Sequence, residues 1–225
     1  EGQGLHVAQA ASRGLSAAAA TPAPRDSARA RGVAVLFGRR AGGGVQPMLM
    51  TWDWDRKGQK WKLAQTLGAD SLGGVGTGEF EAPNDTTIDL VTRTYQTSRY
   101  FDECASCPHV YHVYRFHWGR QGFQGIENRI PPSTYSTFVQ FIEALLGNRE
   151  DAAALLVTDR ALVDQAHRLE WARVQGTWRI APGIEEVPGR LVFYRGQKDA
   201  YQVTFAQRGE AWLISGFAPV TRTVE

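Results

Sequence analysis

The chain has 225 residues, of which 43% are hydrophobic and 21% charged, so it is ordinary for a globular protein and long enough for two small domains. Its formal net charge of +2 and its isoelectric point near 8.7 are too mild to indicate a nucleic-acid partner. No window approaches the ~20 consecutive apolar residues of a membrane helix. We therefore predict a globular protein with no nucleic-acid partner and no transmembrane segment in this chain.

Residues 1–32 are rich in alanine and form the first segment of the chain. Apolar residues recur at helical spacing between His6 and Ala20, which predicts an N-terminal helix there. Pro22 and Pro24 would end that helix. The chain begins at Glu1, and any signal peptide or lipid-anchoring cysteine would lie upstream of it.

Residues 33–130 show the pattern of an antiparallel β unit, because short apolar runs alternate with turn residues and no helical pattern interrupts them. The runs on either side of Asp53–Gly58 are expected to form a hairpin. The predicted strands are 33–37, 45–52, 61–67, 72–80, 88–95 and 110–118.

The stretch from Phe101 to Trp118, which ends in the last of these strands, carries three of the five histidines and an aromatic run. Alternate residues of a strand share a face, so His112, Tyr114, Phe116 and Trp118 should lie together. We expect this aromatic face to be part of the core, with His112 hydrogen-bonded there.

Residues 131–225 form a second predicted unit, which begins after Pro131 and Pro132. Ser133 can cap an amphipathic helix that Gly147 ends. The predicted fold class is therefore α+β, an antiparallel β unit followed by helices and a curved sheet. The further helices are expected at 149–157 and 159–169, and the strands at 176–180, 189–194, 200–207 and 211–219.

The stretch from Gly78 to Val91, GEFEAPNDTTIDLV, resembles one FG-GAP or VCBS-type repeat of the β-propeller proteins. In that family the loop between the two strands can hold calcium with its carboxylates. Here Ala82 and Pro83 stand in the loop, and only Asp85 and Asp89 occupy plausible ligand positions. The resemblance covers about one repeat and implies a strand-loop-strand shape without calcium.

The order of elements from Ser133 to Pro219 resembles an NTF2-like or cystatin-like α+β domain. The resemblance is one of architecture, and it implies a sheet folded around a helix to leave a conical pocket. Such domains range from isomerases to dimerisation modules, so a homodimer is one arrangement it implies, and the fold does not decide the function. The aromatic residues that would line this pocket or fill the core are Trp171, Trp178, Phe193, Tyr201, Phe205 and Trp212.

The two cysteines, Cys104 and Cys107, have several interpretations. Pro108 excludes a c-type haem site, and no helix follows to favour a thioredoxin-like role. Cys104, Cys107, His109 and His112 are all zinc-ligand types, but four ligands within nine residues make a very tight site. A disulfide that closes a short turn is favoured, worth only about 2 kcal/mol, with a reduced structural pair as the main alternative. A disulfide indicates an extracytoplasmic protein, either secreted or a lipoprotein.

Asp164 and His167 are three residues apart on a predicted helix and therefore share a face. A carboxylate that orients an imidazole is a general-base arrangement, but Arg160 and Arg168 nearby are equally typical of a charged surface.

No nucleophile elbow, phosphate loop or zinc-protease motif is present in the sequence. We therefore predict a non-catalytic, extracytoplasmic module that binds a small molecule or a protein and needs no cofactor. One alternative is an NTF2-like enzyme of the isomerase or hydrolase type, with a pocket in residues 131–225 and with Asp164 and His167 as its base and orienting group. The other is a metal-binding protein that uses the Cys104/Cys107 region.

Overall fold

The computed structural model describes residues 15–23, 32–41, 44–84, 87–104, 107–119, 121–181 and 189–222. These residues form two compact units. The first unit contains the described residues up to Gln96 together with Tyr111–Ile130, and the second contains Thr97–Val110 together with those from Pro131 onward. With three antiparallel sheets and four helices in the described part, the chain is β-rich and of the predicted α+β class. None of the described helices is long and apolar enough to cross a membrane.

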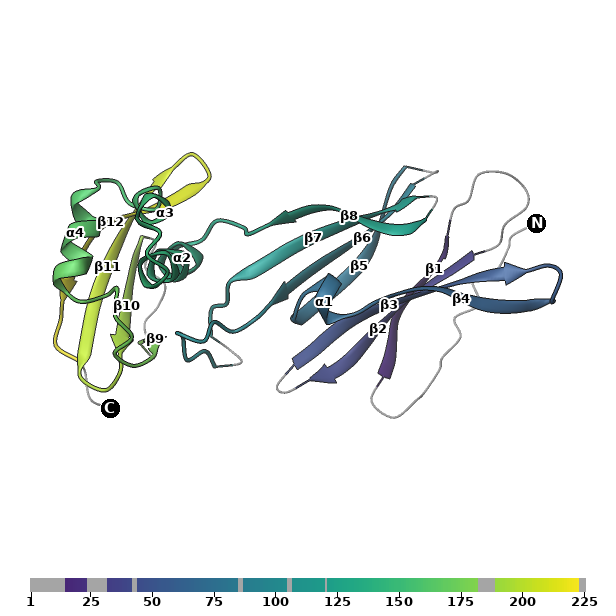
Figure 1. Ribbon diagram of the computed structural model, residues 1–225, viewed down its shortest axis with the longest axis horizontal. Helices are drawn as coiled ribbons and strands as arrows, with labels where there is room; N and C mark the ends of the chain where they lie inside the picture. The colour runs from purple at the N-terminus through teal and green to yellow at the C-terminus, as the bar shows by residue number, and fades with distance from the viewer. Residues whose placement is uncertain are drawn as a thin grey trace. The chain divides into compact units, whose positions relative to one another are not determined.

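The first unit contains two four-stranded sheets in which each strand pairs with its neighbour in the chain (Figure 1). A short helix, α1 (Ala69–Leu72), lies between the two sheets in sequence. The strands of the first sheet are β1 (Leu15–Ala23), β2 (Gly32–Ala41), β3 (Gly44–Asp55) and β4 (Lys60–Leu67). Those of the second sheet are β5 (Val75–Asn84), β6 (Thr87–Tyr95), β7 (Tyr111–Gly119) and β8 (Gly122–Arg129).

The predicted hairpin is confirmed as β3 and β4, and the strands predicted at 88–95 and 110–118 are present as the antiparallel pair β6 and β7. The predicted N-terminal helix is wrong where the structure describes it, since Leu15–Ala23 is a strand paired with β2. The rest of that prediction, residues 6–14, lies outside the described residues. Without β1, the backbone groups along one edge of β2 would lack partners, and satisfying them outweighs the helix propensity of alanine.

The predicted strand over residues 72–80 begins later than expected. Leu72 ends α1 and is fully buried, and the strand starts at Val75. The turn between them needs Gly73, which has φ of +84°. A Cβ on Gly73 would lie 2.0 Å from Oγ1 of Thr94, so a larger residue would collide there.

The core of the first unit lies between its two sheets. Leu36 and Leu49 contribute from the first sheet, and Leu90, Phe116 and Trp118 from the second. The predicted core face of β7 is therefore confirmed for its aromatic residues. His112 differs from them, because it is only half-buried and its Nδ1 approaches Oδ1 of Asn128 at 3.4 Å near the surface.

A side chain also joins the two sheets of the first unit. Gln65 of β4 donates from Nε2 to the carbonyl oxygen of Phe123 (2.8 Å), and its Oε1 accepts from the backbone N–H of the same residue (2.9 Å). The amide thus pairs with β8 as a neighbouring backbone would.

Asp89, one of the two candidate calcium ligands, takes part in an ion-pair cluster on the second sheet. Its Oδ2 accepts from Arg115 Nη1 (3.0 Å) and its Oδ1 lies 2.8 Å from His117 Nδ1. Arg115 also donates to Glu81 at 2.7 Å. Asp85, the other candidate, lies outside the described residues. Both oxygens of Asp89 are therefore occupied by side chains of the neighbouring strand, Arg115 and His117.

This cluster leads to a prediction on the pH dependence of stability. Burial raises the pKa of Asp89, but hydrogen bonds from His117 and Arg115 outweigh it, so the pKa lies below the ordinary value of 3.8. A lowered folded-state pKa stabilises the fold above the unfolded-state pKa, and this contribution is lost as the pH falls through the folded-state value. Asp89→Asn should therefore destabilise the first unit by about 1–2 kcal/mol at neutral pH.

Urea unfolding of the wild type and of Asp89→Asn at a series of pH values gives the free energy of unfolding of each protein. Hydrogen exchange of β6 and β7 reports the change in the sheet that contains Asp89. The difference in unfolding free energy between the wild type and Asp89→Asn should become smaller below pH 3.8. Glu79→Gln, which removes an exposed carboxylate of the same sheet, is the matched control and should change little. A difference in unfolding free energy that stays constant down to pH 2 would contradict the prediction.

The second unit combines three helices with the third sheet (Figure 1). The predicted cap of the first of these helices is confirmed, since Ser133 Oγ accepts from the N–H of Ser136 (2.9 Å) and the N–H of Ser133 donates to Ser136 Oγ (3.0 Å). The helices are α2 (Thr134–Leu146), α3 (Glu150–Ala154) and α4 (Ala161–Arg168). The strands, in the sheet order β12-β11-β10-β9, are β9 (Trp178–Ile180), β10 (Arg190–Arg195), β11 (Asp199–Arg208) and β12 (Ala211–Pro219).

Thr97–Val110, which the sequence placed with the β unit, belongs to the second unit. The N–H of Asp102 donates to the carbonyl of Trp178 (2.7 Å), and the N–H of Trp178 donates to that of Tyr100 (2.8 Å). The segment therefore covers the open edge of β9, which is only three residues long. Because this pairing joins residues that are far apart in the chain, no short-range sequence pattern predicts it.

Candidate functional site

Aromatic rings fill the space between the helices and the sheet of the second unit. Trp171 is fully buried, and the centroid of its ring lies 5.2 Å from that of Trp178, 5.0 Å from Tyr201 and 4.3 Å from Phe217. Among the residues predicted to line a pocket or fill the core, Trp171, Trp178, Phe193, Tyr201 and Phe205 are in this core, and Trp212 packs half-buried at its margin. Their rings contact one another and the helices.

Arg195 closes one end of this aromatic core. Its side chain is only 4% exposed although it is charged. It donates to Oδ2 of Asp199 at 2.7 Å and to the carbonyls of Leu169 and Glu170 at 3.2 Å, and its guanidinium lies 5.5 Å from the ring of Trp178. The guanidinium can be buried because these acceptors form the hydrogen bonds that water would form to it at the surface.

An open pocket of about 380 Å³ lies beside the turn that connects β10 to β11. Asp102, Arg179, Arg222, Thr177 and Gln197 line it, together with two glycines. Gly176 and Gly196 both have positive φ, 103° and 58°, and let the two loops approach closely. We call this feature the arginine pocket.

The two arginines of the pocket are held by the same ring. The guanidinium of Arg222 lies 4.4 Å from the centroid of Tyr194, and that of Arg179 lies 5.6 Å from it. Arg222 also donates to the carbonyls of Gly196 and Gln197, which fixes it against the turn. Cation–π contact therefore orients both guanidinium groups, and the hydrogen bonds to the turn fix that of Arg222 further.

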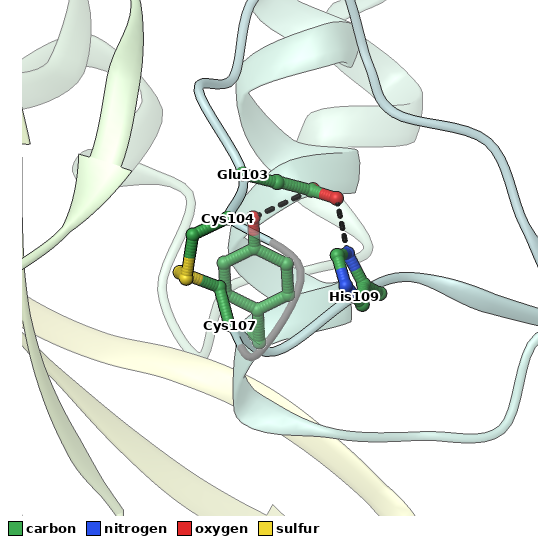
Figure 2. Close-up of a disulfide and its surroundings, with 5 residues drawn as sticks. Glu103, Cys104, Cys107 and His109 are labelled. Atoms are coloured by element: carbon green, nitrogen blue, oxygen red, sulfur yellow. Dashed lines mark hydrogen bonds and ion pairs between the residues drawn. A yellow bond between two sulfur atoms is a disulfide. The ribbon is translucent and has the colours of Figure 1, made fainter. Parts of the chain in front are cut away.

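A buried polar network anchors the wall of the pocket that carries Asp102. Glu103 is 2% exposed in its side chain, and its Oε2 lies 2.6 Å from Nδ1 of His109 (Figure 2). Its Oε1 accepts from the hydroxyl of Tyr135 at 2.7 Å. Burial, and then the hydrogen bond to Glu103, raises the pKa of Tyr135 well above its ordinary value, so the hydroxyl remains a donor. Since Tyr135 belongs to α2, the network ties residues 103–109 to the main helix.

The predicted disulfide between Cys104 and Cys107 is confirmed, with Cα atoms 5.0 Å apart, and it closes the loop between Glu103 and His109 (Figure 2). Oxidised sulfurs leave no thiolates for zinc. His109 bonds to Glu103, and His112 belongs to the first unit. Within the described ranges there is no group of three or more His, Cys, Asp or Glu side chains arranged to hold a metal ion.

Asp164 and His167 lie exposed on α4. His167 Nε2 is 3.5 Å from Oε1 of Glu150, on α3, and neither residue of the predicted pair lines the arginine pocket. The structure thus places the candidate base within a surface ion pair.

Comparison of the chain with protein-family models, with curated proteins and with solved structures finds no significant match to any of them. The resemblances to NTF2-like domains and to FG-GAP repeats therefore stay predictions.

Sequence reasoning did not single out Glu103, Arg195, or the arginines of the pocket. Arg195 follows Leu191 and Phe193 at alternate positions of one strand, so a charge on an inward face was visible in the sequence. Arg179 and Arg222 had no such signal, because a turn and an aromatic ring from elsewhere in the chain bring them together.

Proposed function

We propose that the protein is a non-catalytic binding module whose second unit takes up a small anionic molecule in the arginine pocket. The observation that carries the proposal is the pair of guanidinium groups, of Arg179 and Arg222, positioned over Tyr194 and facing one open pocket. The volume of about 380 Å³ lies within the range of small-molecule sites.

The chemistry of the lining narrows the ligand class. Guanidinium groups bind carboxylate or phosphate oxygens through paired hydrogen bonds. Thr177 and Gln197 add polar side chains, whereas Asp102 would repel a second negative charge and attract an amine or a hydroxyl. A molecule with one anionic group and one hydrogen-bond donor matches this lining best.

Two further observations support a binding module. The interior between helices and sheet is filled with aromatic rings, and the acid–base pair proposed for an enzyme lies on α4, away from the pocket lining. An NTF2-like arrangement of the second unit remains part of the proposal, on the order of its elements alone. The disulfide supports an extracytoplasmic location, secreted or lipid-anchored.

The test is a titration of the ¹⁵N-labelled chain with sodium acetate, glycine and inorganic phosphate, each at constant ionic strength. Saturable shifts are expected at the amides of Thr177, Gly196 and Gln197. Arg179→Gln should weaken binding by about tenfold or more, since it removes a charge-assisted hydrogen bond worth about 1.5–3 kcal/mol.

Arg208→Gln is the matched control, because Arg208 is an exposed arginine of the same sheet outside the pocket. Its binding should equal that of the wild type. Shifts that do not saturate, or that respond equally to both substitutions, would contradict the proposal.

A further inference from the structure

The hairpin of β3 and β4 continues past the rest of the first sheet (Figure 1). In the described part of β2, Gly32 is the terminal partner and pairs with Asp53. Beyond that point Trp54 pairs with Trp61, and Asp55 with Lys60, in a ribbon of two strands. We call residues 52–63 the tryptophan hairpin.

One face of the tryptophan hairpin is apolar. Trp52 pairs with Leu63 and Trp54 with Trp61, so the four side chains share a face of the ribbon. Trp61 is 46% exposed and Leu63 is 58% exposed. The rings of Trp54 and Trp61 pack edge to face at 5.3 Å; Trp54 is half-buried, whereas Trp61 stays exposed.

The tip and the other face of the hairpin are cationic. They carry four cationic residues against the two acids Asp53 and Asp55. Lys62 bonds to Asp55 at 2.7 Å, and all four cationic side chains are exposed. The four are Arg56, Lys57, Lys60 and Lys62.

The choice of lysine at this place is informative. The chain has 25 cationic residues, and three of its only four lysines lie in this hairpin. Protein–protein interfaces are enriched in arginine and depleted in lysine. Lysine has a compact, strongly hydrated charge on a flexible stem, which suits a surface whose anionic groups are mobile and solvated.

We propose that the tryptophan hairpin docks onto a lipid bilayer that contains anionic lipids. Tryptophan favours the membrane–water interface, where its ring is apolar and its N–H meets water. Lysines next to it are attracted to the negative surface potential of such a bilayer. The hairpin supplies both groups on one two-stranded ribbon, and the proposal does not depend on the arginine pocket of the other unit.

The test is co-sedimentation of the full chain with sucrose-loaded vesicles of phosphatidylcholine, with or without phosphatidylglycerol at one lipid in three. Binding is expected to the anionic vesicles, and raising the salt from low to about 0.5 M should weaken it severalfold. The double substitution Trp61→Ser and Leu63→Ser should reduce partitioning of the chain onto the vesicles at least about tenfold, since it removes two apolar side chains that contact the bilayer in this proposal.

Lys57→Gln with Lys60→Gln tests the charge separately and leaves the aromatic packing intact. It should reduce anionic binding about tenfold and change nothing on phosphatidylcholine alone. The matched control is Leu155→Ser with Val174→Ser, which removes two exposed apolar side chains of the second unit, 78% and 70% exposed. It should bind like the wild type.

Three results would overturn the proposal. One is equal partitioning to both vesicle types, and another is no partitioning at low salt. The third is a concentration-dependent dimer, seen by analytical ultracentrifugation, that the hairpin substitutions abolish while vesicle binding is absent. The last result would assign the hairpin to a second copy of the chain.

Discussion

Trp171→Ala is expected to destabilise the second unit by about 3–5 kcal/mol. Trp171 is fully buried and is among the largest side chains of the chain without exposed surface. Its removal deletes edge-to-face contacts with Trp178 and Tyr201 and the tilted contact with Phe217. The surrounding rings belong to both helix and sheet, so they cannot close the cavity without moving an element.

A second substitution at this position separates volume from polarity. In the part of the chain that the structure describes, Nε1 of Trp171 is buried without a hydrogen-bond partner. Trp171→Phe removes that N–H together with part of the ring, so we expect a smaller cost of about 1–2 kcal/mol.

The measurement is denaturant unfolding, followed by hydrogen exchange of peptides from α2 and β11, with peptides of β6 and β7 as an internal reference. Val174→Ala, at a 70% exposed position three residues away, should change stability by less than about 0.5 kcal/mol. A cost below about 1 kcal/mol for Trp171→Ala would show that the aromatic core is not closely packed.

Glu103→Ala should cost the second unit about 3–5 kcal/mol, since each buried polar group left without a partner costs about 1–3 kcal/mol. The hydroxyl of Tyr135 loses its acceptor, and His109 loses a carboxylate at 2.6 Å, both inside the protein. Because Tyr135 lies on α2, loss of Glu103 should release the segment 97–110 before it unfolds the sheet. Hydrogen exchange of that segment is the most direct readout.

Two milder variants test the cause of this effect. Glu103→Gln keeps an acceptor for Tyr135 but removes the charge, and Tyr135→Phe removes one hydrogen bond only, at about 1 kcal/mol. A double-mutant cycle between Glu103→Ala and Tyr135→Phe then gives the coupling energy of the two side chains, because each substitution removes their hydrogen bond. Glu150→Gln, which removes an exposed carboxylate of the same unit, is the control and should be nearly neutral. Equal effects of Glu150→Gln and Glu103→Gln would contradict the role of the network.

Local sequence signals were sufficient for the elements whose stabilising contacts lie within a few residues. The cap at Ser133, the apolar stripe and Gly147 predicted α2 with its start and end, because a helix satisfies its own backbone. The strands predicted at 189–194, 200–207 and 211–219 are likewise present as β10, β11 and β12, which pair in chain order. The disulfide was favoured from a spacing of three residues and is present.

Tertiary structure decided the features that depend on residues far apart in sequence. Residues 15–20 belong to a stretch whose apolar spacing predicted a helix, yet Leu15–Ala23 is a strand because it pairs with β2 along almost its whole length. Thr97–Val110 adjoins β strands in sequence, yet it belongs with α2 and β9 through Glu103 and Asp102. In both cases backbone or buried polar groups require partners, and only the folded chain determines which are within reach.

The arginine pocket shows the same division most clearly. Arg179 and Arg222 are 43 positions apart in a chain with many arginines, and nothing in the spacing links them. They share a pocket because β10 carries Tyr194 beside Arg179 of β9, while Arg222, past the end of β12, bonds to the turn after β10. Residue types and short-range periodicity can be taken from the sequence directly. The pocket instead depends on distances in space, which the pairing of β9 with β10 and the contacts of Arg222 with the turn after β10 set together.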